Sequence, residues 1–165
     1  MPPGIIRPSM DQMRESVFAC LGDIEGKSFL DLFSGSGIIA LEAASRGAAH
    51  VEAVENDPLK RKTLLQNVSI SPSRIHCHFI SSELYVQRAK RAFDYIFLDP
   101  PFPYRFKWEL LASIAASLLV SPESTVLLHR PCEDDQKGIV GEQLDCVDFR
   151  EYGRSIVDFY KRKVV

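Results

Sequence analysis

The chain has 165 residues, of which 45% are hydrophobic and 25% charged, and its formal net charge at pH 7 is −2. This length predicts one domain over residues 1–165, with a short N-terminal leader and a helix within residues 1–22. The slightly acidic balance argues against a broadly basic nucleic-acid-binding protein. No apolar run approaches the ~20 residues of a membrane span and no signal peptide opens the chain, so we expect a cytoplasmic protein.

The first predicted element is an amphipathic helix over about residues 10–22. Ser9 and Gln12 have the spacing of a capping box, so Ser9 is the predicted N-cap. Apolar residues then recur at helical spacing at Met13, Val17, Cys20 and Leu21. The charged residues at the entrance of this helix, taken alone, fit a solvated helix end.

A strand over residues 28–33 runs directly into Ser34-Gly35-Ser36-Gly37, and a helix over 38–46 follows, with Gly47 as its stop signal. A strand, a glycine loop and a helix in this order are typical of nucleotide cofactor sites, because glycines let the backbone approach a ligand closely. The loop lacks the third glycine of the dinucleotide fingerprint, so an ordinary turn is the alternative.

The second predicted strand, residues 50–55, ends in Glu55, which follows Asp31 by 24 residues. An acid at the end of the second strand of a βαβ unit can accept hydrogen bonds from both ribose hydroxyls. A solvated strand end explains Glu55 alone, but the combination with the glycine loop favours a cofactor site.

The rest of the chain alternates in the same way. We predict strands over 74–80, 93–98 and 124–129, helices through residue 91 and over 106–119, and a final strand pair over 145–152 and 155–163. The pattern indicates an α/β fold with a doubly wound, mostly parallel seven-stranded sheet and a C-terminal antiparallel strand pair.

Asp99-Pro100-Pro101-Phe102 follows the strand over 93–98. Two consecutive prolines cannot continue a central strand, so a carboxylate, a rigid carbonyl and an aromatic ring are fixed at its carboxyl end. Ligands bind at that edge of open α/β sheets. An ordinary proline turn is the alternative.

Three further patterns carry less weight. The four cysteines form no CxxC pair and indicate reduced thiols in the core. His76-Cys77-His78 has no second ligand group at metal spacing, so we predict no metal site. The basic runs, residues 60–62 among them, are predicted to be solvated faces.

Together, residues 30–37, Glu55 and residues 99–102 resemble class I S-adenosylmethionine-dependent methyltransferases that act on exocyclic amines. More narrowly, residues 7–18 resemble the signature preceding the core in the bacterial 16S ribosomal RNA guanine-N2 methyltransferase family, which methylates guanine 966. The resemblance implies a Rossmann-like fold, S-adenosylmethionine as cofactor and 16S ribosomal RNA as partner, within a partly assembled small subunit. We expect a monomer.

The resemblance also implies roles for particular residues. The Asp99 carboxylate and the Pro100 carbonyl would accept hydrogen bonds from the guanine amine, and Phe102 would stack on the base. The cofactor would be held by Asp31, Phe33, Ser34, Gly35, Gly37, Glu55, Ser81 and Asp99. The RNA would contact Arg7, Arg14, Pro101, Phe102, Arg105 and Arg130.

Two departures from the family pattern change the expectations. Ser81 stands where the family has Asp or Asn for the adenine amine, so the hydrogen bond there would be neutral and shorter in reach. Family members commonly begin with a basic β-hairpin, whereas this chain starts almost at Arg7, so we expect weak, salt-dependent RNA binding. The alternatives are a DNA adenine-N6 methyltransferase, a catalytically idle cofactor-binding partner subunit and a small-molecule methyltransferase.

Overall fold

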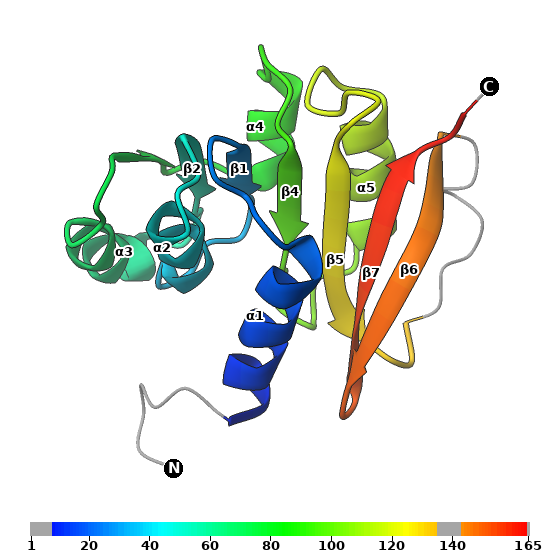
Figure 1. Ribbon diagram of the computed structural model, residues 1–165, viewed down its shortest axis with the longest axis horizontal. Helices are drawn as coiled ribbons and strands as arrows, with labels where there is room; N and C mark the ends of the chain where they lie inside the picture. Colours follow the sequence, from blue (N-terminus) through cyan, green and yellow to red (C-terminus); the bar gives the residue numbers. More distant parts are fainter. Residues whose placement is uncertain (1–7, 135–142, 165) are drawn as a thin grey trace.

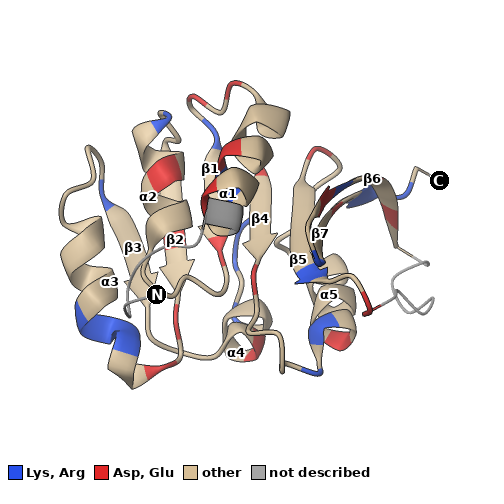
Figure 2. Ribbon diagram, turned by 90° about the horizontal axis from the view of Figure 1, so that it is seen from below, with Lys and Arg blue, Asp and Glu red and all other residues tan. Residues whose placement is uncertain are grey.

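The protein is described by a computed structural model over residues 8–134 and 143–164, in which a seven-stranded sheet has helices on both faces (Figures 1 and 2). The strands are β1 (Ser28–Asp31), β2 (His50–Val54), β3 (Ile75–His78), β4 (Tyr95–Leu98), β5 (Thr125–Pro131), β6 (Leu144–Tyr152) and β7 (Ser155–Arg162). The helices are α1 (Pro8–Leu21), α2 (Ile38–Ser45), the 3₁₀ helix η1 (Pro58–Lys60), α3 (Arg61–Val68), α4 (Ser82–Gln87) and α5 (Lys107–Ala115).

The strand order across the sheet is β3-β2-β1-β4-β5-β7-β6. Strands β1 to β5 are parallel, whereas β7 is antiparallel to both of its neighbours, β5 and β6. The predicted doubly wound sheet with a C-terminal antiparallel pair is therefore confirmed. The chain winds outward from β1 to β3 and then returns to the other side of β1, so the winding direction reverses between β1 and β4.

Alternating side chains of the central strands separate two core layers. In β1, Phe29 packs with α1, α2 and α3 on one face, and Leu30 packs with α4 and α5 on the other. In β4, Phe97 joins the first layer and Ile96 joins the second. Figure 2 shows the sheet between these two groups of helices. Because the central strands are buried on both faces, they are continuous apolar runs in the sequence.

Two helices have other ends than the sequence predicted. Helix α1 begins at Pro8, so Ser9 lies within the helix rather than at its N-cap, and the predicted leader lies outside the described residues. Helix α5 ends at Ala115, short of the predicted residue 119. Ser117 Oγ donates to the Ile114 carbonyl and accepts from the Leu119 N–H, and this turn directs Leu119 into the core.

The prediction of core cysteines was wrong for most of them. Cys20, Cys132 and Cys146 are exposed, and only Cys77 is half-buried. On α1 the buried stripe runs through Val17 and Phe18 rather than toward Cys20. Within the two described ranges, no helix is long and apolar enough to cross a membrane.

Candidate active site

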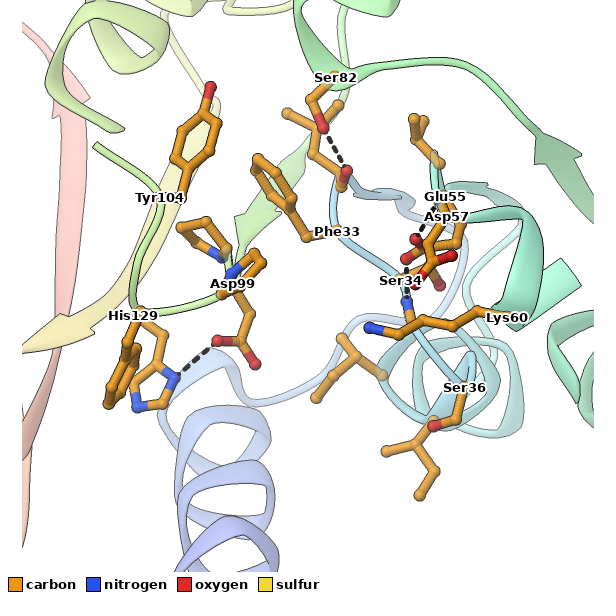
Figure 3. Close-up of a pocket in the computed structure, with 18 of the residues that line it drawn as sticks. Phe33, Ser34, Ser36, Glu55, Asp57, Lys60, Ser82, Asp99, Tyr104 and His129 are labelled. Carbon is orange, nitrogen blue, oxygen red and sulfur yellow. Dashed lines mark hydrogen bonds and ion pairs between the residues drawn. The ribbon is translucent and has the colours of Figure 1, made fainter. Parts of the chain in front are cut away.

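A pocket of about 1010 Å³ opens at the carboxyl ends of the parallel strands. Its walls are the loops after β1, β2, β3 and β4, together with parts of α1 and β5 and the β6–β7 turn. The pocket therefore lies where the winding direction of the sheet reverses, which is the usual ligand position in open α/β sheets. Figure 3 shows side chains from the loops after β1, β2 and β4, together with Ser82 and His129, around one space.

The glycine loop forms one wall of this pocket. Gly35 and Gly37 both have positive φ, 56° and 85°, a region that side-chain-bearing residues rarely adopt. The position that a Cβ of Gly35 would occupy is open, so the backbone is accessible there. At Gly37 a Cβ would lie 2.6 Å from Leu64 Cδ1, so this glycine lets α2 pack against α3.

Glu55 follows β2 and fixes the glycine loop. Its Oε1 accepts a hydrogen bond from the Gly35 N–H at 2.7 Å, and its Oε2 accepts from the Asp57 N–H at 2.9 Å. The side chain lines the pocket, and each carboxylate oxygen retains a further acceptor position. Glu55 therefore lies in the pocket wall with acceptor capacity left, and its contact with ribose hydroxyls stays a prediction.

Asp31 lies beneath the loop rather than in the pocket wall. Its Oδ2 accepts from Ser34 Oγ at 2.9 Å, whereas its buried Oδ1 has no partner in the described part of the chain. Burial raises the pKa of Asp31 to about 7; the negative charges of Asp99 and Glu55 add to this shift, and the Ser34 hydrogen bond opposes it. An orphaned, buried carboxyl oxygen is costly, so a hydrogen-bond donor or a positive charge near Asp31 would be stabilising.

The Asp99-Pro100-Pro101-Phe102 segment leaves β4 into the pocket. Asp99 Oδ1 lies 2.8 Å from His129 Nδ1, whereas Oδ2 has no partner among residues 8–134 and 143–164. The Pro100 carbonyl likewise accepts no hydrogen bond there, although the next carbonyl, that of Pro101, accepts from the Tyr104 N–H at 2.8 Å. Two neighbouring acceptors are thus available to a ligand, and Phe102, 48% exposed, lines the same pocket.

Ser81 lines the pocket but is partly engaged. Its Oγ accepts from the Leu84 N–H at 3.1 Å and caps α4. One of its two acceptor positions is therefore taken, and the hydroxyl proton is the group most readily offered to a ligand. Because one acceptor position remains, the contact of Ser81 with the adenine edge stays a prediction.

Of the arginines predicted to contact RNA, Arg14 lines the pocket, whereas Arg105 does not. Arg14 also pairs with Asp11 at 3.2 Å and with Glu42 at 3.6 Å. Arg105 is exposed outside the pocket lining, and Arg7 lies outside the described residues.

The prediction for Arg130 was wrong. Its side chain is 10% exposed, with Nε 2.6 Å from Asp158 Oδ2 and Nη2 3.3 Å from Oδ1, and its guanidinium lies over the Trp108 ring. It does not line the pocket. A buried arginine with a bidentate carboxylate partner is part of the fold and cannot reach a phosphate without breaking that pair.

Several pocket residues were not predicted, namely Lys60, Tyr104, His129, Arg154 and Ser155. Lys60 belongs to a basic run that was predicted to be a solvated face; it is exposed, yet Figure 3 shows it at the pocket. His129 could have been found from strand order, because β4 and β5 pair with Leu98 opposite Leu128. The next residues of these parallel strands, Asp99 and His129, are therefore side by side.

Comparison with protein families gives one match over nearly the whole chain, to the family described as Conserved hypothetical protein 95, over residues 1–161. A candidate rRNA methyltransferase of Bacillus subtilis, YlbH, is 29% identical over 95% of this chain and 88% of that protein. Ribosomal RNA small subunit methyltransferase D of Escherichia coli is 33% identical over 61% of this chain and 51% of that protein.

Two further comparisons bear on substrate and fold. The tRNA1(Val) (adenine(37)-N6)-methyltransferase of Aliivibrio salmonicida is 33% identical over 47% of this chain and 34% of that protein. Among solved structures, a candidate methyltransferase of Escherichia coli, yhhF, has a TM-score of 0.83 at 23% identity, covering 100% of this chain and 92% of that one. At 23% identity the structural similarity to yhhF supports a shared fold and nothing more specific.

Proposed function

Because this chain belongs to the family described as Conserved hypothetical protein 95, we propose that it is an RNA methyltransferase that moves a methyl group from S-adenosylmethionine to the exocyclic N2 amine of a guanine in 16S ribosomal RNA. The observation that carries the proposal is the pair of free acceptors, Asp99 Oδ2 and the Pro100 carbonyl, in a pocket beside the glycine loop. The names of the Bacillus and Escherichia relatives support ribosomal RNA as the substrate.

The residues of the pocket fit this cofactor. Glu55 offers carboxylate oxygens for ribose hydroxyls, and Phe33, Ser34 and Gly35 line the pocket, with open space at Gly35. Gly37 does not line the pocket and packs against Leu64 instead. Ser81 can meet the adenine edge, and the orphaned oxygen of Asp31 favours a positive charge near the loop. When bound, S-adenosylmethionine supplies a methyl group activated by a positively charged sulfur.

Asp99 and Pro100 would compensate for the low nucleophilicity of the guanine amine. A guanine amine is a poor nucleophile because its lone pair is delocalised into the ring. Two acceptors aimed at its hydrogens favour a nitrogen geometry in which the lone pair can attack, and they stabilise the positive charge that develops on nitrogen. The remaining acceleration comes from holding the reacting groups in line.

The mouth of the pocket offers contacts for RNA. Phe102 is half exposed and can stack on an unstacked base, with Pro101 exposed beside it. In this proposal Arg14, in the pocket wall, and Arg105, exposed outside it, contact phosphates of the RNA. We propose a partly assembled small subunit as the substrate, and a single-domain monomer as the acting form.

An adenine N6 amine is the second candidate acceptor. The name of the Aliivibrio relative favours it, and the same two acceptors would serve an adenine amine equally well. The free Asp99 Oδ2 and Pro100 carbonyl argue against an idle cofactor-binding subunit, because a partner that only binds cofactor has no use for them.

To test the proposal, the purified protein is incubated with S-adenosylmethionine that carries a radioactive methyl group. Separate reactions contain immature small subunits, naked 16S RNA, tRNA or duplex DNA. We expect label in ribosomal RNA and none after Asp99→Ala, with calorimetry showing that this variant still binds the cofactor. Glu15→Ala, an exposed acid on α1, is the control and should remain active. Label confined to tRNA or DNA would contradict the proposed substrate, and cofactor binding without any transfer would contradict the activity.

A further inference from the structure

We propose that His129 is the positioning residue of the active site, holding Asp99 so that only Oδ2 meets the substrate amine. The inference rests on the proposed function and adds a residue to it. His129 lies near the carboxyl end of β5, 8% exposed, in the pocket wall. Its Nδ1 lies 2.8 Å from Asp99 Oδ1 and its Nε2 lies 2.8 Å from Ser155 Oγ (Figure 3 shows the contact with Asp99).

Both ends of the imidazole are engaged, and this determines where its protons lie. Ionised Asp99 can only accept, so Nδ1 must carry a proton. Where the Ser155 hydroxyl donates to the Tyr152 carbonyl, at 3.1 Å, Nε2 donates to Ser155 Oγ. Where the hydroxyl turns toward the ring instead, Nε2 accepts from it. In both arrangements Nδ1 donates to Asp99.

This bond fixes the carboxylate in two ways. Oδ1 is occupied, and rotation of the carboxyl group is restrained, so Oδ2 keeps one direction into the pocket. The same ring packs against Phe102, with centroids 5.6 Å apart at 60°. His129 therefore contacts both Asp99, which would bind the amine, and Phe102, which would stack on the base. On its other side the imidazole is held by the hydrogen bond with Ser155, at the start of β7.

His129 touches neither the transferred methyl group nor the amine in this account, so its loss should affect turnover more than binding. His129→Leu keeps apolar bulk and removes both donors, and we expect kcat to fall roughly 10- to 100-fold, the scale for a small misplacement of a reacting group. KM for RNA and Kd for S-adenosylmethionine should change less than about 3-fold. His129→Asn places an amide N–H near the position of Nδ1 and should recover most of the kcat.

The chain offers a matched control. His78 binds the Glu52 carboxylate at 2.7 Å, the same kind of pair, but outside the pocket lining. His78→Leu should leave kcat unchanged. If His129→Leu does not fold, His129→Asn and His129→Gln replace it, because the longer amide of Gln reaches toward Ser155 instead of Asp99, and only Asn should stay active.

A second readout needs no activity. In ligand-free protein, long-range ¹H–¹⁵N NMR should show a protonated Nδ1 on His129, and Asp99→Leu should change that signal while leaving His78 unaffected. An unprotonated Nδ1, or full turnover by His129→Leu, would overturn the inference. If the NMR result holds but wild-type protein methylates no RNA, the proposed function fails instead, so the two failures are distinguishable.

Discussion

Glu55 binds the glycine loop and is also the proposed acceptor for the ribose hydroxyls of the cofactor. Glu55→Ala removes an acceptor for the ribose and also releases the Gly35 N–H. We expect a loss of roughly 1–3 kcal/mol in S-adenosylmethionine binding, the scale of hydrogen bonds to charged groups. Calorimetry on the folded variant measures it, with Glu15→Ala as control, and unchanged affinity would remove Glu55 from the site.

Asp31 makes the stability of the ligand-free protein depend on pH. Its raised pKa means that the folded state holds a proton that the unfolded state releases above about pH 4. The contribution of Asp31 to the free energy of unfolding is therefore fully present below about pH 4. It falls by up to roughly 4 kcal/mol as the pH rises to about 7, where Asp31 also ionises in the folded state.

Urea unfolding of wild type and Asp31→Asn between pH 4 and pH 8 measures this dependence. The amide keeps an acceptor for Ser34 but cannot ionise, so the variant should gain stability relative to wild type as the pH rises. Parallel curves for the two proteins would show that Asp31 ionises normally in the folded state.

Phe102 and Phe106 allow a paired test of base stacking. Both rings are exposed, Phe102 at 48% and Phe106 at 60%, but only Phe102 lines the pocket. Phe102→Ala should weaken RNA-dependent activity by about 1–3 kcal/mol, the stacking scale, with little change in cofactor affinity. Phe106→Ala should have a smaller effect. Equal losses in RNA activity and cofactor binding would place the Phe102 ring in the fold or in the cofactor pocket.

At the scale of elements, the loop between β1 and α2 also determines how α2 and α3 pack. Gly37→Ala forces a side chain into a positive-φ position and against Leu64. We expect about 1–3 kcal/mol of destabilisation, the range for overpacking. Chemical denaturation measures it, and Leu64→Ala in the same chain should relieve the clash but not the backbone strain. Wild-type stability in Gly37→Ala would contradict the close approach.

The sequence pattern was enough to predict the seven strands and the winding of the sheet. The buried central strands are apolar runs between turn residues, whereas the mostly exposed β6 was predicted from its pairing with β7 across the turn at Gly153. The glycine loop, Glu55 and the segment after β4 were found by their place at strand ends. The bond between Asp99 and His129 was not, because it depends on which strands are neighbours. The burial of Arg130 depends on Asp158 in β7, which lies 28 residues away in the sequence.

At the scale of the whole molecule, charge limits how the protein can bind RNA. The net charge is −2, and Arg14 already pairs with two acids. Affinity for nucleic acid comes mainly from cations that neutralise phosphates. We therefore expect micromolar or weaker binding to naked 16S RNA at physiological salt, with a strong salt dependence.

Titration of naked RNA and of immature subunits at several salt concentrations measures this binding. The exposed basic run at residues 60–62 lies at the start of α3, seen as a blue band in Figure 2. If the run contacts phosphates, reversing the charges of Arg61 and Lys62 should flatten the salt dependence. Tight binding to naked RNA with little salt dependence would contradict the expectation.

Asp99 and the Pro100 carbonyl are proposed to orient a guanine amine of ribosomal RNA for attack on the methyl group of S-adenosylmethionine. Mass spectrometry of nucleosides from immature small subunits, treated with the protein and S-adenosylmethionine, tests this proposal most directly. We predict N2-methylguanosine in 16S RNA with wild-type protein and none with Asp99→Ala. N6-methyladenosine as the product, or N2-methylguanosine formed equally by Asp99→Ala, would contradict it.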